Sequence, residues 1–208
     1  MPDLPVMLNV RDRRCVVIGG GPVARRRAAA LLAAGATVTV IAPQLDLSDL
    51  PVTTIERAWQ PGDLAGAFLV VIATDDPAVN AAAANEARQA GALVNRADDP
   101  AAGDLLIPAH RHEGPITLAV HTGGISPAAA AAIRDELAAA LDRDWITLLE
   151  TIAPYRARIQ ETIADPAERR RRLTQLASPD ALAALRTGGA NALQKFCEQV
   201  LDSLHHPS

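Results

Sequence analysis

The sequence predicts an α/β fold: a doubly wound parallel sheet, then a small unit of two strands and a helix, then helices only. Over the first hundred residues, short β-branched runs alternate with helix-length alanine-rich segments, which is typical of parallel strands joined by crossover helices. After about residue 104, two apolar runs follow each other too closely for a crossover helix, which favours antiparallel pairing. From Asp142 onward no segment has the composition of a strand.

The predicted parallel sheet has five strands, at residues 14–18, 37–41, 52–55, 68–73 and 92–95. The run at 68–73 is apolar throughout, as expected of a strand that is covered on both faces. A helix is predicted from Val23 to Ala34, ending at Gly35. A second helix is predicted from Pro77 to Ala90, with an N-cap aspartate before the proline at its first position.

Beyond the sheet, strands are predicted at 104–107 and 116–120, with a loop at 110–115 between them. Ser126-Pro127 is a strong helix start, and the alanine-rich segment after it runs to Leu141. Three prolines are expected to divide the rest into three or four short helices: Pro154, Pro166 and Pro179. The predicted domain boundaries are therefore 1–103, 104–141 and 142–208.

Composition excludes several classes of protein. The chain has 208 residues, of which 49% are hydrophobic, enough for a packed core. No apolar run reaches the roughly 18–20 residues of a membrane helix, and the first residues do not resemble a secretory signal. The two cysteines cannot build a disulfide framework or a cysteine-based zinc site. We therefore expect a cytoplasmic protein with no membrane partner.

Charge and single-residue counts exclude further classes of protein. The net charge of −4 and the aromatic content of 2% disfavour nucleic-acid binding. The only lysine, Lys195, is not in a Gly-Lys-Ser/Thr sequence, so the phosphate-binding loop of the P-loop proteins is absent. No metal site is predicted, and the pair His205-His206 is interpreted as a chain end rather than as a pair of ligands.

A glycine-rich loop joins the first strand to the first helix. Residues 19–24 read Gly-Gly-Gly-Pro-Val-Ala, which fits the Gly-x-Gly-x-x-Gly/Ala pattern of dinucleotide-binding Rossmann folds. In that pattern Gly19 permits a tight turn, Gly21 lets the backbone approach a pyrophosphate, and Ala24 allows the helix to pack closely on the strand. The helix start, at Pro22 and Val23, then offers its positive end to the phosphates.

The residue that normally selects between NAD and NADP is missing. An acidic side chain about 20 positions after the loop usually binds the ribose 2′-hydroxyl, but the second strand ends Ile-Ala-Pro-Gln at 41–44. Gln44 or backbone amides are the alternatives for the ribose. Arg25 or Arg26 would suit a 2′-phosphate, although both are also explained as solvated helix residues.

Several stretches together resemble the precorrin-2 dehydrogenase/sirohydrochlorin ferrochelatase family, the N-terminal module of siroheme synthase. Besides the glycine loop, they are Leu-Pro-Val at 4–6, Arg-Asp-Arg at 11–13, Ala-Thr-Asp-Asp-Pro at 73–77, Val-Asn-Arg-Ala-Asp-Asp-Pro at 94–100, Gly-Pro-Ile at 114–116 and Thr-Gly-Gly-Ile-Ser-Pro at 122–127. The match covers residues 4–141 well and the helical remainder loosely.

The resemblance implies a Rossmann domain, a small dimerisation domain and a helical C-terminal domain. It implies that precorrin-2 is oxidised to sirohydrochlorin with NAD, and some members also insert ferrous iron; the sequence leaves iron insertion open. The methyltransferase module of the fused siroheme synthases needs a further domain, so that activity is not expected here. A homodimer is expected through residues 104–141, because two short strands and one helix cannot bury their own apolar face.

The resemblance also implies site residues. Asp98 matches the proposed catalytic aspartate, three residues past Asn95 at the edge of the sheet where ligands bind; Asp99 is the alternative. The dinucleotide is expected to contact Gly19, Gly21, Pro22, Val23, Ala24, Pro43, Gln44, Thr74 and Asn95. The tetrapyrrole is expected to contact Arg111, in a basic hairpin tip with His110 and His112, and also His121, Thr122 and Gly123. His121 departs from the family, which carries a small hydroxyl residue there.

Two other functions stay open at this point. A non-catalytic dinucleotide-sensing domain would also begin with a Rossmann glycine loop, but it would need neither Asp98 nor a second substrate site. A dehydrogenase of another small substrate would use Asp98 as its base. Formation of NADH from precorrin-2 and NAD would separate the three hypotheses.

Overall fold

The computed structural model describes residues 3–202. Its contacts divide the chain into two compact units: the first ends at Ile107 and the second begins at Pro108. His205 and His206, for which no metal site is predicted, lie outside the described residues.

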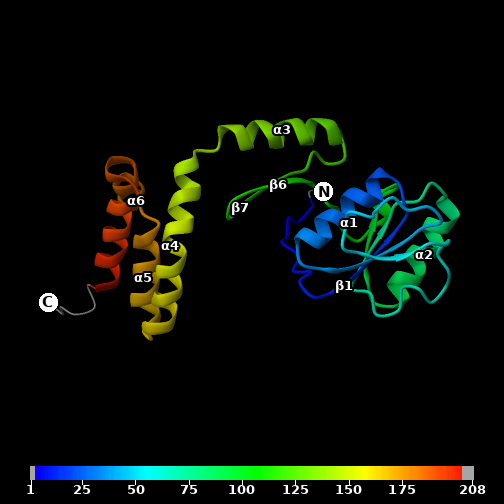
Figure 1. The fold of residues 1–208 in the computed structure, drawn as a ribbon, viewed down its shortest axis with the longest axis horizontal. Helices are drawn as coiled ribbons and strands as arrows, with labels where there is room; N and C mark the ends of the chain where they lie inside the picture. Colours follow the sequence, from blue (N-terminus) through cyan, green and yellow to red (C-terminus); the bar gives the residue numbers. More distant parts are fainter. Residues whose placement is uncertain (1–2, 203–208) are drawn as a thin grey trace. The chain divides into compact units, whose positions relative to one another are not determined.

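The first unit is a five-stranded parallel sheet with helices (Figure 1). The strands lie in the order β3-β2-β1-β4-β5, which is the doubly wound, Rossmann-type order. The predicted fold is therefore confirmed. In chain order the elements are β1 (Arg14–Ile18), α1 (Pro22–Ala33), β2 (Thr37–Ile41), β3 (Thr53–Ile55), β4 (Leu69–Ile72), α2 (Pro77–Gln89), β5 (Leu93–Arg96) and a 3₁₀ turn (Pro100–Ala102).

Both faces of this sheet are buried, which explains why β4 and the last four residues of β1 are apolar. Alternate residues of β1 enter different clusters: Cys15 and Val17 pack with α1, whereas Val16 and Ile18 pack with α2. All four residues of β4 are buried. The Cys15 thiol is completely buried, and burial raises its pKa to about 11, so it is an unreactive core residue.

The strand predicted at 104–107 is wrong. This segment lies along β5 instead: the Asp104 amide donates to the Val94 carbonyl at 2.8 Å, and the Asp104 carboxylate accepts from the Val94 amide at 2.9 Å. Leu105 and Ile107 pack against the core beside α1. The apolar run is therefore explained by burial in the first unit, not by a hairpin.

The hairpin itself begins five residues later than predicted. Strand β6 (Ala109–Glu113) pairs antiparallel with β7 (Ile116–Val120), leaving a two-residue loop. Gly114 has a positive φ of 56°, which fits the Gly-first loops of type II′ hairpins. The predicted loop at 110–115, with its basic tip, is thus wrong: Arg111 and its two histidine neighbours are strand residues.

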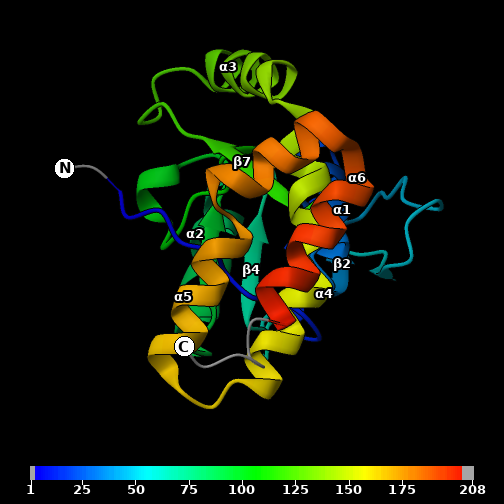
Figure 2. The same cartoon turned by 90° about the vertical axis from the view of Figure 1, so that its left-hand side faces the viewer.

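The second unit continues with four helices: α3 (Pro127–Ala140), α4 (Arg143–Thr162), α5 (Pro166–Leu176) and α6 (Pro179–Asp202). Helices α4, α5 and α6 lie side by side (Figures 1 and 2) and share one apolar core that includes Leu148, Ile159 and Leu193. Within residues 3–202, no helix is both long and apolar enough to cross a membrane.

The predicted break at Pro154 is wrong. Helix α4 continues through it, because the proline is exposed while Ile152 and Ile159 of the same helix are buried. The core contacts offset the one backbone hydrogen bond that proline removes. The interruption lies instead in α6, where Gly189 has a φ of 68°.

Candidate functional site

The glycine loop lies at the carboxyl edge of the sheet, where the strand order reverses. Strand β1 has β2 on one side and β4 on the other, and ligands of doubly wound sheets bind at such a switch point. The loop is fixed at both sides: the Gly19 amide donates to the Ile41 carbonyl at 2.9 Å, and the Ala73 amide donates to the Ile18 carbonyl at 2.8 Å.

Two glycines of the loop are required by close packing. Gly19 has a φ of 126°, and a Cβ there would lie 2.3 Å from the Ala73 carbonyl oxygen. At Gly20 a Cβ would lie 2.0 Å from the Gln44 carbonyl oxygen. The sequence motif treats position 20 as variable, so this second constraint is found only in the structure.

The third glycine is different. A Cβ built on Gly21 meets no atom within 4 Å, so this backbone faces open space. Gly21 is the N-cap of α1 and has no side-chain cap; Pro22 follows and Ala24 is fully buried. A packed turn, an open glycine and an uncapped helix start are what a dinucleotide pyrophosphate requires. The residues present therefore fit this group.

The segment after β4 forms a hydrogen-bonded turn. The Thr74 hydroxyl donates to Asn80 Oδ1 at 2.6 Å, and Asn80 Nδ2 donates back to the Thr74 carbonyl at 3.0 Å. The Asp76 carboxylate caps α2 by accepting from the amides of Ala78 and Val79. Asn80 is 1% exposed. The Thr74 side chain thus fixes the turn, and its backbone lies beside Gly19.

Asp98 lies just beyond β5, at the same edge of the sheet, in a bidentate ion pair with Arg96. Arg96 Nε donates to one carboxylate oxygen at 2.8 Å and Nη2 to the other at 2.5 Å. The Arg96 side chain is 9% exposed and that of Asp98 is 29% exposed. This pairing, together with a hydrogen bond from Asn80, holds the pKa of Asp98 far below its usual range.

Asn80 and Arg96 are therefore members of the site that sequence reasoning missed. Asn80 comes from α2, Arg96 ends β5, and both reach Asp98. The sequence carries a signal for each: an asparagine among the alanines of the predicted helix at 77–90, and an arginine two positions before the candidate aspartate.

The Asn95 side chain contacts the segment that ends the first unit. Its Nδ2 donates to the Leu105 carbonyl at 3.0 Å. Its Oδ1 is buried and has no hydrogen-bond partner among the described residues. The side chain therefore anchors the segment that follows the 3₁₀ turn.

Pro43 and Gln44 are exposed where β2 ends. Arg25, in the first turn of α1, is not simply solvated: Nη1 donates to the Asp46 carbonyl at 2.7 Å and Nη2 to Asp49 Oδ2 at 2.5 Å. Asp49, an acidic residue farther along the loop after β2, thus lies beside the first turn of α1.

The predicted tetrapyrrole contacts lie in the second unit. Arg111 forms ion pairs with Glu113 at 2.6 Å and Asp135 at 3.7 Å. The Thr122 hydroxyl donates to the Ser126 carbonyl and accepts from its amide, which closes the turn before α3. His121 and Gly123 are exposed, and Gly123 has a φ of 63°.

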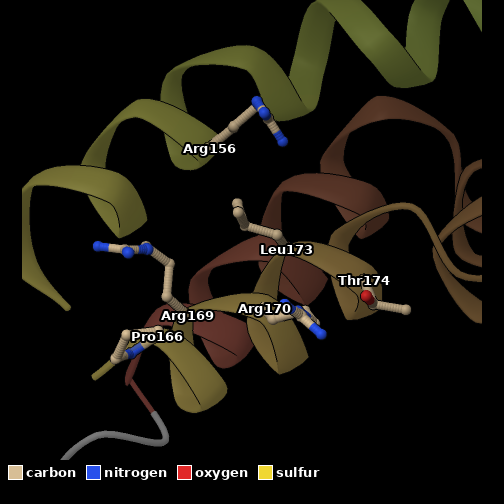
Figure 3. A pocket seen from close by; sticks show the side chains of 6 residues that line it. All are labelled: Arg156, Pro166, Arg169, Arg170, Leu173 and Thr174. Carbon is tan, nitrogen blue, oxygen red and sulfur yellow. The ribbon is translucent and has the colours of Figure 1, made fainter. Parts of the chain in front are cut away.

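The arginine run of α5 divides into two roles. Arg172 is buried and bonds Glu168 and the Val200 carbonyl, each at 2.6 Å, so it joins α5 to α6. Arg169 and Arg170 instead line a shallow pocket beside Leu173, with Arg156 of α4 opposite (Figure 3). Among residues 3–202, no three histidine, cysteine or acidic side chains are grouped to hold a metal ion.

Comparisons with known proteins agree with this geometry. A family model described as "Putative NAD(P)-binding" matches residues 6–109. The siroheme synthase of Methylococcus capsulatus is 38% identical over 82% of this chain and 37% of its own length. That of Citrobacter koseri is 35% identical over 97% of this chain and 46% of its own length. The chain thus spans less than half the length of these relatives.

A solved structure matches almost the whole chain. The protein named "SirC, precorrin-2 dehydrogenase" superposes with a TM-score of 0.76 at 26% identity, over 96% of this chain and 99% of its own. The family model, the relatives and this structure agree with the family that the sequence motifs indicate. The chain belongs to the precorrin-2 dehydrogenase/sirohydrochlorin ferrochelatase family, through an NAD(P)-binding domain related to that of the siroheme synthases.

Proposed function

We propose that this protein oxidises precorrin-2 to sirohydrochlorin in the cytoplasm, with NAD as the hydride acceptor. The observation that carries the proposal is the match to a precorrin-2 dehydrogenase over nearly the full length of both chains. The geometry of the glycine loop supports it, since Gly21 leaves room at an uncapped helix start.

The dinucleotide would lie along the carboxyl edge of the sheet. Gly19 and Gly21 would face the pyrophosphate, and the first amides of α1, at Val23 and Ala24, would donate to it. The remaining contacts would come from residues that follow β2 and β4, and from one residue within β5: Pro43, Gln44, Thr74 and Asn95. When bound, NAD supplies the nicotinamide ring that accepts a hydride.

Asp98 is proposed as the catalytic residue. The reaction removes a hydride and a proton from precorrin-2, so positive charge develops on the macrocycle as the hydride leaves. Because Arg96 and Asn80 keep Asp98 ionised, its carboxylate stabilises that charge and accepts the proton, which then passes to water. Arg96 orients the carboxylate and makes it a weak base, so proton transfer to Asp98 is favourable only from an acidic, cationic macrocycle.

Four residues of the second unit are proposed to contact the tetrapyrrole: Arg111, His121, Thr122 and Gly123. Tetrapyrrole carboxylates suit the guanidinium of Arg111, which would exchange Glu113 and Asp135 for the substrate. His121 would donate to another carboxylate. Thr122 and Gly123 would shape the turn against which the macrocycle lies.

A homodimer through residues 104–141 is part of the proposal, and iron is proposed only as a second substrate. Ferrous iron insertion would expel two pyrrole protons; binding to the metal acidifies them, so that the weakly basic carboxylate of Asp98 would pass them to water one at a time. No resident metal is required by either reaction.

The test is an anaerobic assay with purified protein, precorrin-2 and NAD, in which NADH and the sirohydrochlorin chromophore are recorded together. Equal amounts of both products support the proposal. Dinucleotide binding without any oxidation of precorrin-2 would favour the sensing domain and contradict the proposal. Continuing the assay with ferrous iron tests the second reaction.

A further inference from the structure

Arg25 connects the start of α1 to the loop after β2. It stands four residues after Gly21, and its guanidinium donates to the Asp46 carbonyl at 2.7 Å and to Asp49 Oδ2 at 2.5 Å. The side chains of Arg25 and Asp49 are 41% and 59% exposed. The pair is therefore open to a ligand from the solvent side.

The pair joins the start of α1 to the loop after β2, the two places between which the adenosine ribose lies in doubly wound folds. In doubly wound folds the ribose lies between the glycine loop and the end of the second strand, where an acid binds the 2′-hydroxyl or an arginine accepts a 2′-phosphate. Here the end of β2 carries Pro43 and Gln44, both exposed and neither acidic. The Gln44 backbone touches the glycine loop at Gly20, so this loop forms one wall of the ribose region.

The two side chains have opposite consequences for a 2′-phosphate. A free Arg25 fork would bind the phosphate strongly. Arg25 is instead already paired, and the Asp49 carboxylate would repel a second negative group. The pair as a whole is neutral and offers a carboxylate oxygen as acceptor for a hydroxyl.

We propose that Asp49 determines the preference for NAD over NADP, by engaging Arg25 and by placing its own carboxylate beside the ribose. Asp49 thus takes the part of the acidic residue that is missing from the end of β2. The inference rests on the proposed function, because it concerns the dinucleotide site that serves the dehydrogenase reaction.

The test compares equilibrium binding of NADH and NADPH by the enhancement of their fluorescence on binding. Three variants are required: Asp49→Asn, the double variant Arg25→Gln/Asp49→Asn, and Asp46→Asn. The last is the matched control: it removes an equal charge from the same loop, while Asp46 hydrogen-bonds Arg25 only through its backbone and its carboxylate acts on Arg25 less strongly than that of Asp49 does.

The wild-type protein is expected to bind NADH more tightly than NADPH. Asp49→Asn is expected to shift the ratio of the two dissociation constants toward NADPH by about tenfold, because Arg25 becomes available to the phosphate. The double variant should lose the gain in NADPH affinity, and Asp46→Asn should keep the wild-type ratio.

Two results would overturn the inference: an unchanged ratio in Asp49→Asn, or an equal shift in Asp46→Asn. Both are distinguishable from failure of the proposed function. If the proposed function alone were wrong, the wild-type protein would bind NADH with the expected preference but would not oxidise precorrin-2. A wild-type protein that binds neither dinucleotide would contradict both proposals.

Discussion

At the scale of single residues, the central feature is the pairing of Asp98 with Arg96. A carboxylate that accepts hydrogen bonds from Nε and Nη2 of a buried guanidinium is held in one orientation and kept ionised. The same pairing makes it a weaker base than a free aspartate. Arg96 therefore orients the Asp98 carboxylate and keeps it charged. Replacing either residue leaves the other without its counter-charge.

Replacing Asp98 tests its proposed catalytic role. Asp98→Ala and Asp98→Asn should keep NAD affinity, because the glycine loop is untouched, but lower the turnover of precorrin-2 by at least about 10²-fold. Turnover is measured with saturating NAD and precorrin-2. Asp99→Asn tests the alternative aspartate, one residue away and without a side-chain cap role, and should keep wild-type turnover. Wild-type turnover in both Asp98 variants would show that Asp98 is structural.

Replacing Arg96 tests the charge pairing through pH. Because the folded-state pKa of Asp98 is lowered, its contribution to stability is fully present above its unfolded pKa of about 3.9. That contribution is lost as the pH falls through the folded value. Arg96→Gln should therefore be less stable than wild type at neutral pH, and the difference should shrink on acidification to about pH 3.

Urea unfolding across this pH range measures the effect of Arg96→Gln. Arg26→Gln, which removes the same charge from an exposed position of α1, is the control. A stability difference that is the same at every pH would contradict the assigned pairing.

At the scale of elements, the glycine loop combines two kinds of constraint. Gly19 and Gly20 are required by contacts with neighbouring backbone, whereas Gly21 faces open space. Folding and ligand binding therefore depend on different glycines of the same loop.

Two substitutions separate these constraints. Gly21→Asp should fold but lose dinucleotide binding, since its side chain would occupy the place of the pyrophosphate and set a like charge against it. Gly20→Ala should lower the unfolding temperature, because its Cβ would collide with the Gln44 carbonyl. Thermal unfolding and NADH fluorescence measure the two effects. Wild-type NADH affinity in Gly21→Asp would refute the assignment of the loop.

Elements with a strong local pattern could be predicted from the sequence, and elements decided by distant contacts could not. The alternation of apolar strands and alanine-rich helices predicts the parallel sheet, and the prolines at 77 and 127 predict two helix starts. The run at 104–107 has strand-like composition, but it lies along β5 with Leu105 and Ile107 partly buried against the core, and nothing local distinguishes the two outcomes. Pro154 likewise stays within a helix because of the core that α4 joins.

The same division applies to the candidate site. The sequence predicts the glycine loop, because it follows a recognisable strand, and the family resemblance indicates Asp98. It does not predict the contacts of Asp98 with Arg96 and Asn80, or of Arg25 with Asp49, since these depend on side-chain directions at the sheet edge.

At the scale of the whole molecule, the segment from β6 to α3 is incompletely covered by its own unit. The two strands form a sheet of their own, and two-stranded sheets are marginal in water. Ala130 is the only residue of α3 that is buried in the described structure. Ile133 and Leu137, one helical turn apart, are 42% and 50% exposed.

A second copy of the chain would cover this apolar surface, since identical surfaces pair readily about a two-fold axis. We therefore predict a homodimer, with a mass twice the 21.8 kDa of one chain.

The double variant Ile133→Glu/Leu137→Glu should be a monomer, because burying two carboxylates at an interface is strongly unfavourable. Ala139→Glu is the control: it adds a charge on the opposite side of α3, two residues beyond Leu137. Light scattering measures the mass, and circular dichroism checks that each variant is folded. If the dimer contributes to the tetrapyrrole site, the monomeric variant should bind NADH normally but oxidise precorrin-2 slowly. A wild-type protein that stays a monomer at high concentration would exclude the dimer, and the apolar face of α3 would then need another partner.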